Sequence, residues 1–220
     1  MINGTQAVFS FCWHQFSGIL AHITFKCGYD SILTHLENPP LRDLSNFLGY
    51  CEAWAHSVHE HHESEEHLVF LVLQPRLDMS REIEQHKVVH AGLESLFAYI
   101  KRAREDRRAF DAAELRGMME KLKGPLYEHL DDEVAHISAE NLVAAGFTAD
   151  EMRKLDKDLE TYARSHGNVT LLVPYMRSHT VPEMKDIWPP MPWALRKVLI
   201  PYMIALRHSG YWKYSPYAMS

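Results

Sequence analysis

The sequence lacks the features that mark several common classes of protein. Its three cysteines, Cys12, Cys27 and Cys51, form no CxxC pair, so neither a disulfide framework nor a thiolate zinc site is indicated. The longest apolar run near the C-terminus, VLIPYMIAL over residues 198–206, is too short to span a bilayer. No basic region precedes the apolar residues at the N-terminus. We therefore expect a cytoplasmic protein in a reducing compartment, without a membrane partner.

Extended basic surface is also scarce. The formal net charge is -6, and the most basic stretch, KRAREDRR over residues 101–108, is interrupted by acids. Binding to a phosphate backbone needs a continuous basic stripe, so no nucleic-acid partner is expected. The chain is 220 residues long and 46% hydrophobic, which is typical of a globular protein with one core.

Alternating strand patterns are nearly absent, whereas apolar residues recur at helical spacing through most of residues 5–165. This periodicity predicts an all-α protein. We expect a first helix that stops at Gly28, a fourth that is interrupted at Gly124-Pro125, and caps at Asp111 and Thr148. The expected helices cover about 6–26, 41–73, 80–104, 111–143 and 148–166.

The last part of the chain has a different composition. Six prolines and three tryptophans occur between residues 174 and 212, which leaves little room for long helices. Flexible linkers are poor in aromatic residues, so we expect an apolar, irregular segment that covers the bundle. The predicted organisation is therefore a helical domain over residues 1–165 and a packed C-terminal extension over 166–220.

The stretch SVHEHHESEEHLVF, residues 57–70, contains a HxxxE pair in three frames. An apolar stripe precedes it and continues after it, and the gap in that stripe is filled by His62 and Glu66. The His59 frame belongs to the solvated face, and the His61/Glu65 frame lies at the edge of the stripe. Because a buried His and Glu need partners or a cation, His62 and Glu66 are the predicted inward pair.

Two further helices repeat this spacing. His86 and His90 are four apart in EQHKVVHAGL, and His129 and Glu133 are four apart in LYEHLDDEVAH, where Asp132 is the alternative carboxylate. Such pairs stack two ligands on one helix face. The first helix offers two candidates on one face, His14 and His22, of which His14 is favoured.

Together these positions predict a ligand set of five imidazoles and two carboxylates without a thiolate. Such a set suits iron, manganese or zinc, and two carboxylates can bridge a pair of metals. One metal would take three histidines and the other two, which leaves an open position for dioxygen or another diatomic molecule. The predicted ligands are His14, His62, Glu66, His86, His90, His129 and Glu133.

These motifs resemble those of the hemerythrin-like HHE cation-binding domain proteins in the form found in fungi. That family has a His on the first helix, HxxxE on the second, HxxxH on the third, and HxxxE or HxxxxD on the fourth. The Pro- and Trp-rich ending of the chain is also similar. The resemblance implies an up-and-down four-helix bundle that holds a non-heme, carboxylate-bridged pair of iron ions.

Two functions are compatible with that resemblance. The first is a binding protein for dioxygen or iron, which the histidine-rich set favours because imidazoles stabilise ferrous iron. The second is a di-iron oxygenase or oxidase, possible in fungal secondary metabolism. In addition, four histidines on the exposed side of the second helix could bind divalent metals weakly: His56, His59, His61 and His67.

Overall fold

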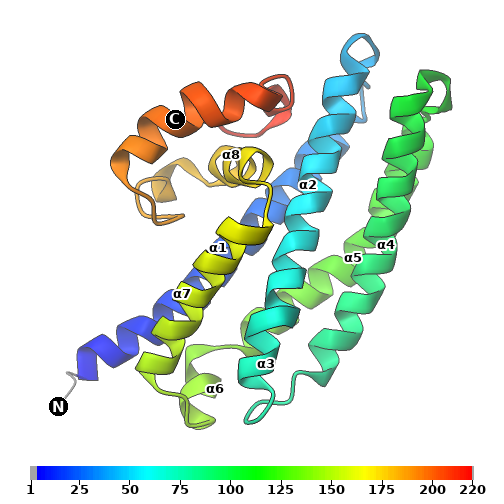
Figure 1. Cartoon of the computed structure of the whole chain (residues 1–220). Helices are drawn as coiled ribbons and strands as arrows, with labels where there is room; N and C mark the ends of the chain where they lie inside the picture. Colours follow the sequence, from blue (N-terminus) through cyan, green and yellow to red (C-terminus); the bar gives the residue numbers. More distant parts are fainter. Residues whose placement is uncertain (1–3, 220) are drawn as a thin grey trace.

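The structure is a computed structural model that describes the backbone of residues 4–219 and the side chains of residues 11–219. Within that part of the chain, every regular element is helical and none is a strand (Figure 1). The prediction of an all-α protein is therefore confirmed. The remaining ends of the two predicted domains, residues 1–3 and Ser220, lie outside the described residues.

Four long helices surround the main core. They are α1 (Gly4–His35), α2 (Leu44–Ser64), α4 (Ser80–Glu105) and α5 (Ala112–His136). Helix α1 packs on α2 and α5, and α4 also packs on α2 and α5. The apolar side chains between them are fully buried and include Trp54, Leu93 and Leu126. These contacts enclose one core; the finer up-and-down bundle stays a prediction.

The second predicted helix, over residues 41–73, is a continuous helical run of four segments with three types of turn. A 3-10 turn, η1 (Leu41–Asp43), leads into α2; a π-helical segment, η2 (Glu65–Val69), follows it; and α3 (Phe70–Leu73) ends the run before Pro75. A π-turn contains more residues than an α-turn, and such turns are frequent at functional sites. Here the wide turn begins at Glu65, within the histidine-rich stretch.

The predicted caps are present. The Asp111 side chain accepts hydrogen bonds from the N–H groups of Ala113 and Glu114 at the start of α5. Thr148 and Glu151 form a capping box at the start of α7 (Ala149–His166), which packs along α1 (Figure 1). Between α5 and α7 the chain forms α6 (Ala139–Ala144), capped by Ser138, so the fourth helix ends at His136, earlier than predicted.

Two predicted interruptions are wrong. Helix α1 continues through Gly28 to His35, because Gly28 serves close packing: a Cβ there would lie 2.3 Å from Tyr175 Oη and 2.5 Å from Trp54 Cδ1. Pro125 lies inside α5 without ending it. A proline removes one helical hydrogen bond, but α5 is held on both sides by its packing on α1 and α4.

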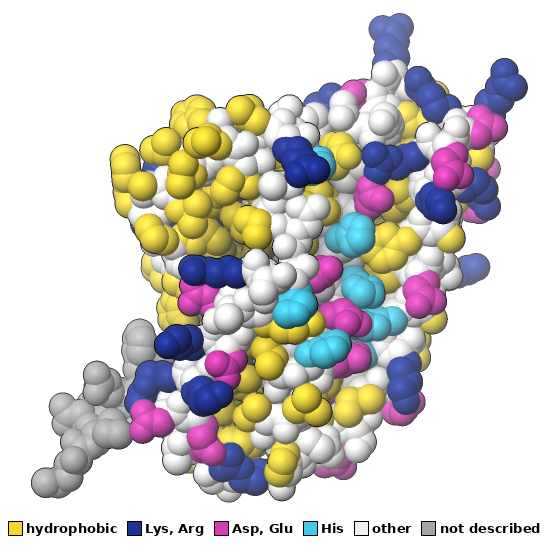
Figure 2. All heavy atoms as spheres, viewed as in Figure 1, with side chains coloured by type: hydrophobic (Ala, Val, Ile, Leu, Met, Phe, Trp, Pro, Cys, Tyr) yellow, Lys and Arg dark blue, Asp and Glu magenta, His cyan; other side chains and the backbone are white. Residues whose placement is uncertain are grey.

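The C-terminal part is more helical than predicted. It contains α8 (Val169–His179), a π-helical segment η5 (Leu195–Ile204), and three 3-10 turns, η4 (Pro182–Met184), η6 (Ala205–His208) and η7 (Trp212–Tyr214). Helix α8 and η7 pack on α1 and α2. Apolar side chains gather on the surface of this segment (Figure 2). No described helix combines the length and the apolar character needed to cross a bilayer.

Two glycines of α1 provide a matched test of this packing. Gly28→Ala should lower the free energy of unfolding by roughly 1–3 kcal/mol, because the new methyl group would overlap two fully buried side chains. Gly18→Ala meets nothing within 4 Å and should raise it by about 0.5–1 kcal/mol through helix propensity. Urea denaturation of both variants measures the difference, and equal effects would contradict the packing at Gly28.

Candidate metal centre

Buried polar side chains gather in the middle of the four long helices. Their exposed fractions are 6% or less except for His61, which is partly buried. Because ionisable side chains are rarely buried without partners, this group is the first candidate for a functional site. We call it the buried cluster; it consists of His22 from α1, His61, His62 and Glu65 from α2 and η2, His86 from α4, and His129 and Glu133 from α5.

The buried cluster divides into two groups that share Glu65. In each group the ligand atoms lie within 4.8 Å of one another: His22, His61, Glu65 and Glu133 form one, and His62, Glu65, His86 and His129 form the other. We call them the two-histidine group and the three-histidine group. Both draw side chains from several helices, so neither exists before the long helices pack.

The two carboxylates lie between these groups. Glu65 Oε1 is 2.9 Å from His61 Nε2, while Glu65 Oε2 is 3.7 Å from His86 Nε2. Glu133 Oε2 is 3.3 Å from His22 Nε2 and 3.6 Å from His129 Nε2. Carboxylates that face two groups of nitrogen ligands are the arrangement that bridges a pair of metal ions in bundle cores.

Acceptors outside the cluster orient three of the imidazoles. His22 Nδ1 lies 3.0 Å from the carbonyl oxygen of Leu130, and His86 Nδ1 lies 2.9 Å from Glu66 Oε1. These oxygens can only accept, so the proton sits on Nδ1 and the Nε2 lone pair points inward. His129 Nδ1 faces the side-chain oxygen of Gln85 at 3.4 Å, which favours the same tautomer more weakly.

The inward nitrogens meet at close range. His86 Nε2 and His129 Nε2 are 3.0 Å apart, and His22 Nε2 and His61 Nε2 are 3.1 Å apart. Burial lowers the pKa of His86 to about 3 and the pKa of His129 to about 4. At neutral pH, therefore, neither imidazole of that pair is protonated to its cationic form. One neutral imidazole of each pair can donate an N–H···N hydrogen bond to the other in one tautomer, and a cation bound by both nitrogens would replace that proton.

Several buried atoms of the cluster have no hydrogen-bond partner in the protein. They include both ring nitrogens of His62 and one oxygen each of Glu65 and Glu133. Burial, together with the charges of His86 and His129, lowers the pKa of His62 well below its usual range. Its imidazole is therefore neutral, the form that binds metals. Unpartnered nitrogens and oxygens of this kind fit a pair of cations.

The pKa values of the two carboxylates are shifted in opposite directions. Burial raises the pKa of Glu65 well above its usual range, and the Glu133 carboxylate raises it further. For Glu133, burial also acts to raise the pKa, but the neighbouring imidazoles, chiefly His22 and then His129, outweigh it, so its pKa is lowered. The two carboxylates therefore titrate as a coupled pair, and a cation bound by both would favour the ionised form of each.

The structure brings together four of the seven sequence-predicted residues, His62, His86, His129 and Glu133. It places His14 elsewhere: its Nδ1 lies 2.6 Å from Asp156 Oδ1 on α7. The alternative first-helix candidate, His22, occupies the position that His14 was expected to take.

The other two predicted residues lie beside the cluster. Glu66 supports His86 from outside, and His90 groups with Glu66 and His86 without joining either group of the cluster. The fallback carboxylate Asp132 accepts from Gln85 Nε2 at 2.7 Å and is one residue removed from the metal-facing side chains.

His61 and Glu65, which were expected at the edge of the apolar stripe and outside the ligand set, lie in the buried cluster. The spacing contains a signal for Glu65, because it follows the buried Val58 by seven residues, close to two full turns. The i, i+4 spacing from His62 instead pointed to Glu66. The π-helical turn that begins at Glu65 changes the phase of the helix afterwards, so the apolar residues after it no longer mark the inward face before it.

Comparison with known proteins leaves the family open. No family model matches the chain, and no solved structure gives a significant match. The chain is 24% identical over 184 residues to the "Dimeric xanthone biosynthesis cluster protein R11" of Cryptosporiopsis sp. (strain 8999). The match covers 79% of this chain and 66% of the relative, so the chain spans slightly less than two thirds of that protein's length.

The lowered histidine pKa values predict acid sensitivity of the metal-free protein. Between about pH 4 and 6.5 the unfolded chain protonates His62, His86 and His129, whereas the folded chain does not. The free energy of unfolding should therefore fall on acidification, by about 1.4 kcal/mol per pH unit for each such histidine. Glu65, whose raised pKa acts in the opposite direction, offsets one of the three.

Urea denaturation of chelator-treated protein at pH 7, 6 and 5 measures this dependence. His129→Gln should flatten it by the contribution of one histidine. A stability that is constant from pH 7 to 5 would mean that these histidines are not held neutral in the folded state.

Proposed function

We propose that the buried cluster holds two non-heme iron ions, bridged by carboxylates, and that the protein binds dioxygen or another diatomic molecule there, in oxygen or iron handling or sensing. The observation that carries this proposal is the position of Glu65, whose two oxygens face two separate groups of inward ring nitrogens. A single ion would leave one of these groups, with its closely spaced nitrogens, unexplained.

The ligand composition supports an unequal pair of ions. His62, His86 and His129 would hold one ion, and His22 and His61 the other, with Glu65 and Glu133 between them. This set has the five imidazoles and two carboxylates expected from the sequence, although three of its members differ from the predicted ones. The two-histidine ion would have fewer protein ligands and therefore an open position, as sites that bind a further ligand require.

Iron is favoured by the chemistry of the donor set together with the resemblance to hemerythrin-like proteins. The ligands are imidazoles and carboxylates without a thiolate, a combination that suits iron, manganese or zinc. When bound, iron supplies the electrons that binding of dioxygen requires, which zinc cannot. The predicted four-helix bundle is the usual setting for such a pair.

The protein's own residues orient the ligands and limit solvent. The carbonyl of Leu130 and the carboxylate of Glu66 hold the imidazoles of His22 and His86 with Nε2 inward. Phe25 packs on the His61 ring, and Phe70 packs on the His86 ring, with ring centroids 5.1 and 4.9 Å apart. Such an apolar lining excludes water, which protects a reduced metal from uncontrolled oxidation.

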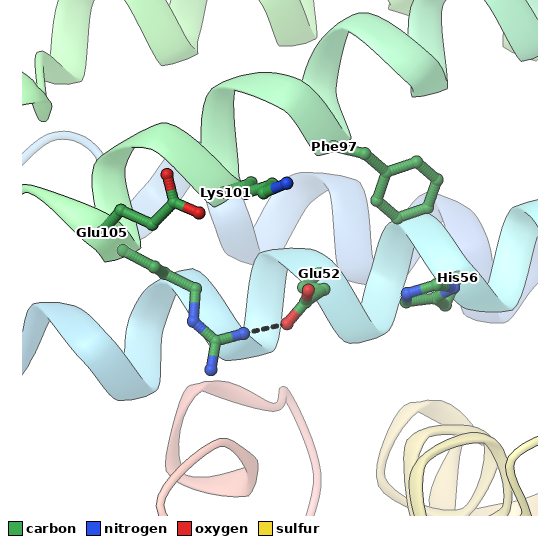
Figure 3. A pocket seen from close by; sticks show the side chains of 6 residues that line it. Glu52, His56, Phe97, Lys101 and Glu105 are labelled. Carbon is green, nitrogen blue, oxygen red and sulfur yellow. Dashed lines mark hydrogen bonds and ion pairs between the residues drawn. The ribbon is translucent and has the colours of Figure 1, made fainter.

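The positions of the surface grooves favour a diatomic ligand of the buried cluster over an organic substrate. One groove of about 450 Å³ lies between α2 and α4 and is lined by Glu52, His56, Phe97, Lys101, Arg104 and Glu105 (Figure 3). A second groove, of about 390 Å³, is lined by Arg81, Glu82, Asp132, Ala135 and His136. Neither includes a side chain of the buried cluster, whereas a diatomic molecule needs no such opening.

A second candidate function is a di-iron oxygenase or oxidase. Its support is the similarity to a protein named for a dimeric xanthone biosynthesis cluster, together with a ligand set that suits a redox metal. The apolar surface of the C-terminal segment (Figure 2) could then contact a lipophilic substrate. Multiple turnovers of an organic substrate by the iron-loaded protein would place this function first.

Anaerobic iron loading tests the proposed function. The loaded, gel-filtered protein should contain two iron ions per chain, and its visible spectrum should change on exposure to dioxygen and return when dioxygen is removed. The spectrum reports binding because charge-transfer absorption depends on the ligands of the metal. Two ions with no spectral response to dioxygen or nitric oxide would leave the metal centre but reject diatomic binding.

Two variants test the ligand set itself. Glu65→Gln keeps the shape of the side chain but removes the negative charge that both ions share, so iron content should fall from two ions per chain to one or none. His14→Ala should retain two, because His14 is paired with Asp156 outside the cluster. Elemental analysis after chelation of loosely held ions decides; loss of iron in His14→Ala with retention in Glu65→Gln would reverse the assignment.

A further inference from the structure

A second set of ligand side chains lies between α2 and α4 outside the buried cluster. His59 and Glu63, four residues apart on α2, and His90 on α4 have ligand atoms within 4.8 Å of one another, and all three are half-buried. We call them the outer triad. The rings of His59 and His90 stack at 5.0 Å, and His90 Nε2 is buried without a hydrogen-bond partner.

The outer triad is connected to the buried cluster through shared histidines. His90 also forms a group with Glu66 and His86, which we call the middle triad, and His86 belongs to the three-histidine group. The carboxylates of the outer and middle triads are equally accessible, since the Glu63 and Glu66 side chains are 34% and 36% exposed, whereas His86 at the inner end is fully buried. Each group thus shares one ligand with the next one inward.

The rings along this series lie nearly parallel. His90 is tilted by 22° to His62 and by 24° to His86, at centroid distances of 5.6 and 5.9 Å, and His62 stacks on His86 at 4.2 Å. Along this series, His90 Nε2 and both ring nitrogens of His62 have no hydrogen-bond partner. A cation could exchange its ligands one at a time along such a series without ever losing all of them, as multi-site conduction requires.

The charges around the outer triad favour a cation. The carboxylates of Glu63, Glu66 and Glu94 act electrostatically on His90. Histidine and acidic side chains gather on the surface over α2 and α4 (Figure 2). The neighbouring groove contains cationic Lys101 and Arg104, but these are balanced by Glu52, which bonds Arg104, and by Glu105 (Figure 3).

We propose that the outer triad is a loading site for a divalent transition metal ion, which passes through the middle triad into the buried cluster. The proposal rests on the proposed function for the destination of the ion. The outer triad itself is a binding site of two imidazoles and one carboxylate, suited to Fe²⁺, Co²⁺ or Zn²⁺. Its half-exposed position and small ligand number make it weaker than the cluster, as release inward requires.

The first experiment measures the rate of metal uptake with Co²⁺, whose visible absorption reports ligation. Metal-free protein is mixed with Co²⁺ in a stopped-flow instrument. The double variant His59→Ala/Glu63→Ala should fill the cluster to the same final content as the wild type but about tenfold or more slowly. The matched control is His56→Ala/Glu60→Ala, which removes the same side-chain types at the same spacing on α2 and belongs to no ligand group of the described residues.

The control should load at the wild-type rate. Equal slowing of both double variants would show a general effect of surface charge and overturn the route. An unchanged rate in His59→Ala/Glu63→Ala would also overturn it. Thermal unfolding of the metal-free variants checks that both remain folded.

The second experiment tests the outer triad without the cluster. In Glu65→Gln/His129→Ala the cluster is disabled, while the outer triad keeps all its side chains. Calorimetric titration with Co²⁺ should show one weakly bound ion per chain, and adding His59→Ala and Glu63→Ala should abolish it. No such ion would overturn the outer site; an empty cluster in the wild type, with this ion present, would instead reject the proposed function alone.

Discussion

The structure depends on the burial of seven ionisable side chains among the four long helices. Imidazoles and carboxylates lose their hydration there, and two pairs of inward ring nitrogens lie only 3.0 and 3.1 Å apart. Such an arrangement costs several kcal/mol unless the groups find partners. Two bound cations would offset that cost, and because they bind only the folded chain, their affinity adds to its stability.

This constraint explains features that surround the cluster. The carbonyl of Leu130 and the carboxylate of Glu66 each fix the proton of a ligand imidazole on the outer nitrogen. The π-helical turn that begins at Glu65 follows directly on the two histidines that the end of α2 contributes to the cluster, His61 and His62. Such turns are frequent at functional sites, and this one lies at the buried cluster.

Much of the fold follows from local signals in the sequence. The 3.6-residue periodicity, the cap at Asp111 and the capping box at Thr148 predicted the helices and two of their starts. The lengths of α1 and α5 did not follow, because Gly28 serves a close contact with residues far along the chain and Pro125 is tolerated through tertiary packing. Both depend on partners that local patterns do not reveal.

The sequence predicted the kinds of ligand in the candidate site, five imidazoles and two carboxylates, better than it predicted which residues supply them. The i, i+4 spacing indicated His62, His86, His129 and Glu133 because it depends only on helix geometry. The choice between His14 and His22 depends on which side of α1 faces α7, where Asp156 pairs with His14. The choice between Glu65 and Glu66 depends on the π-helical turn. The first choice needs the packing of distant helices; for the second, the spacing from Val58 favours Glu65, whereas the apolar residues beyond the π-helical turn favour Glu66.

Anomalous X-ray diffraction at the iron edge, from crystals of the iron-loaded protein, tests the central claim most directly. The account predicts two peaks about 3.5–4 Å apart, both bonded to Glu65. One should be ligated by His22 and His61, and the other by His62, His86 and His129. A single peak within the cluster, or iron bound elsewhere while the seven side chains keep their metal-free arrangement, would contradict it.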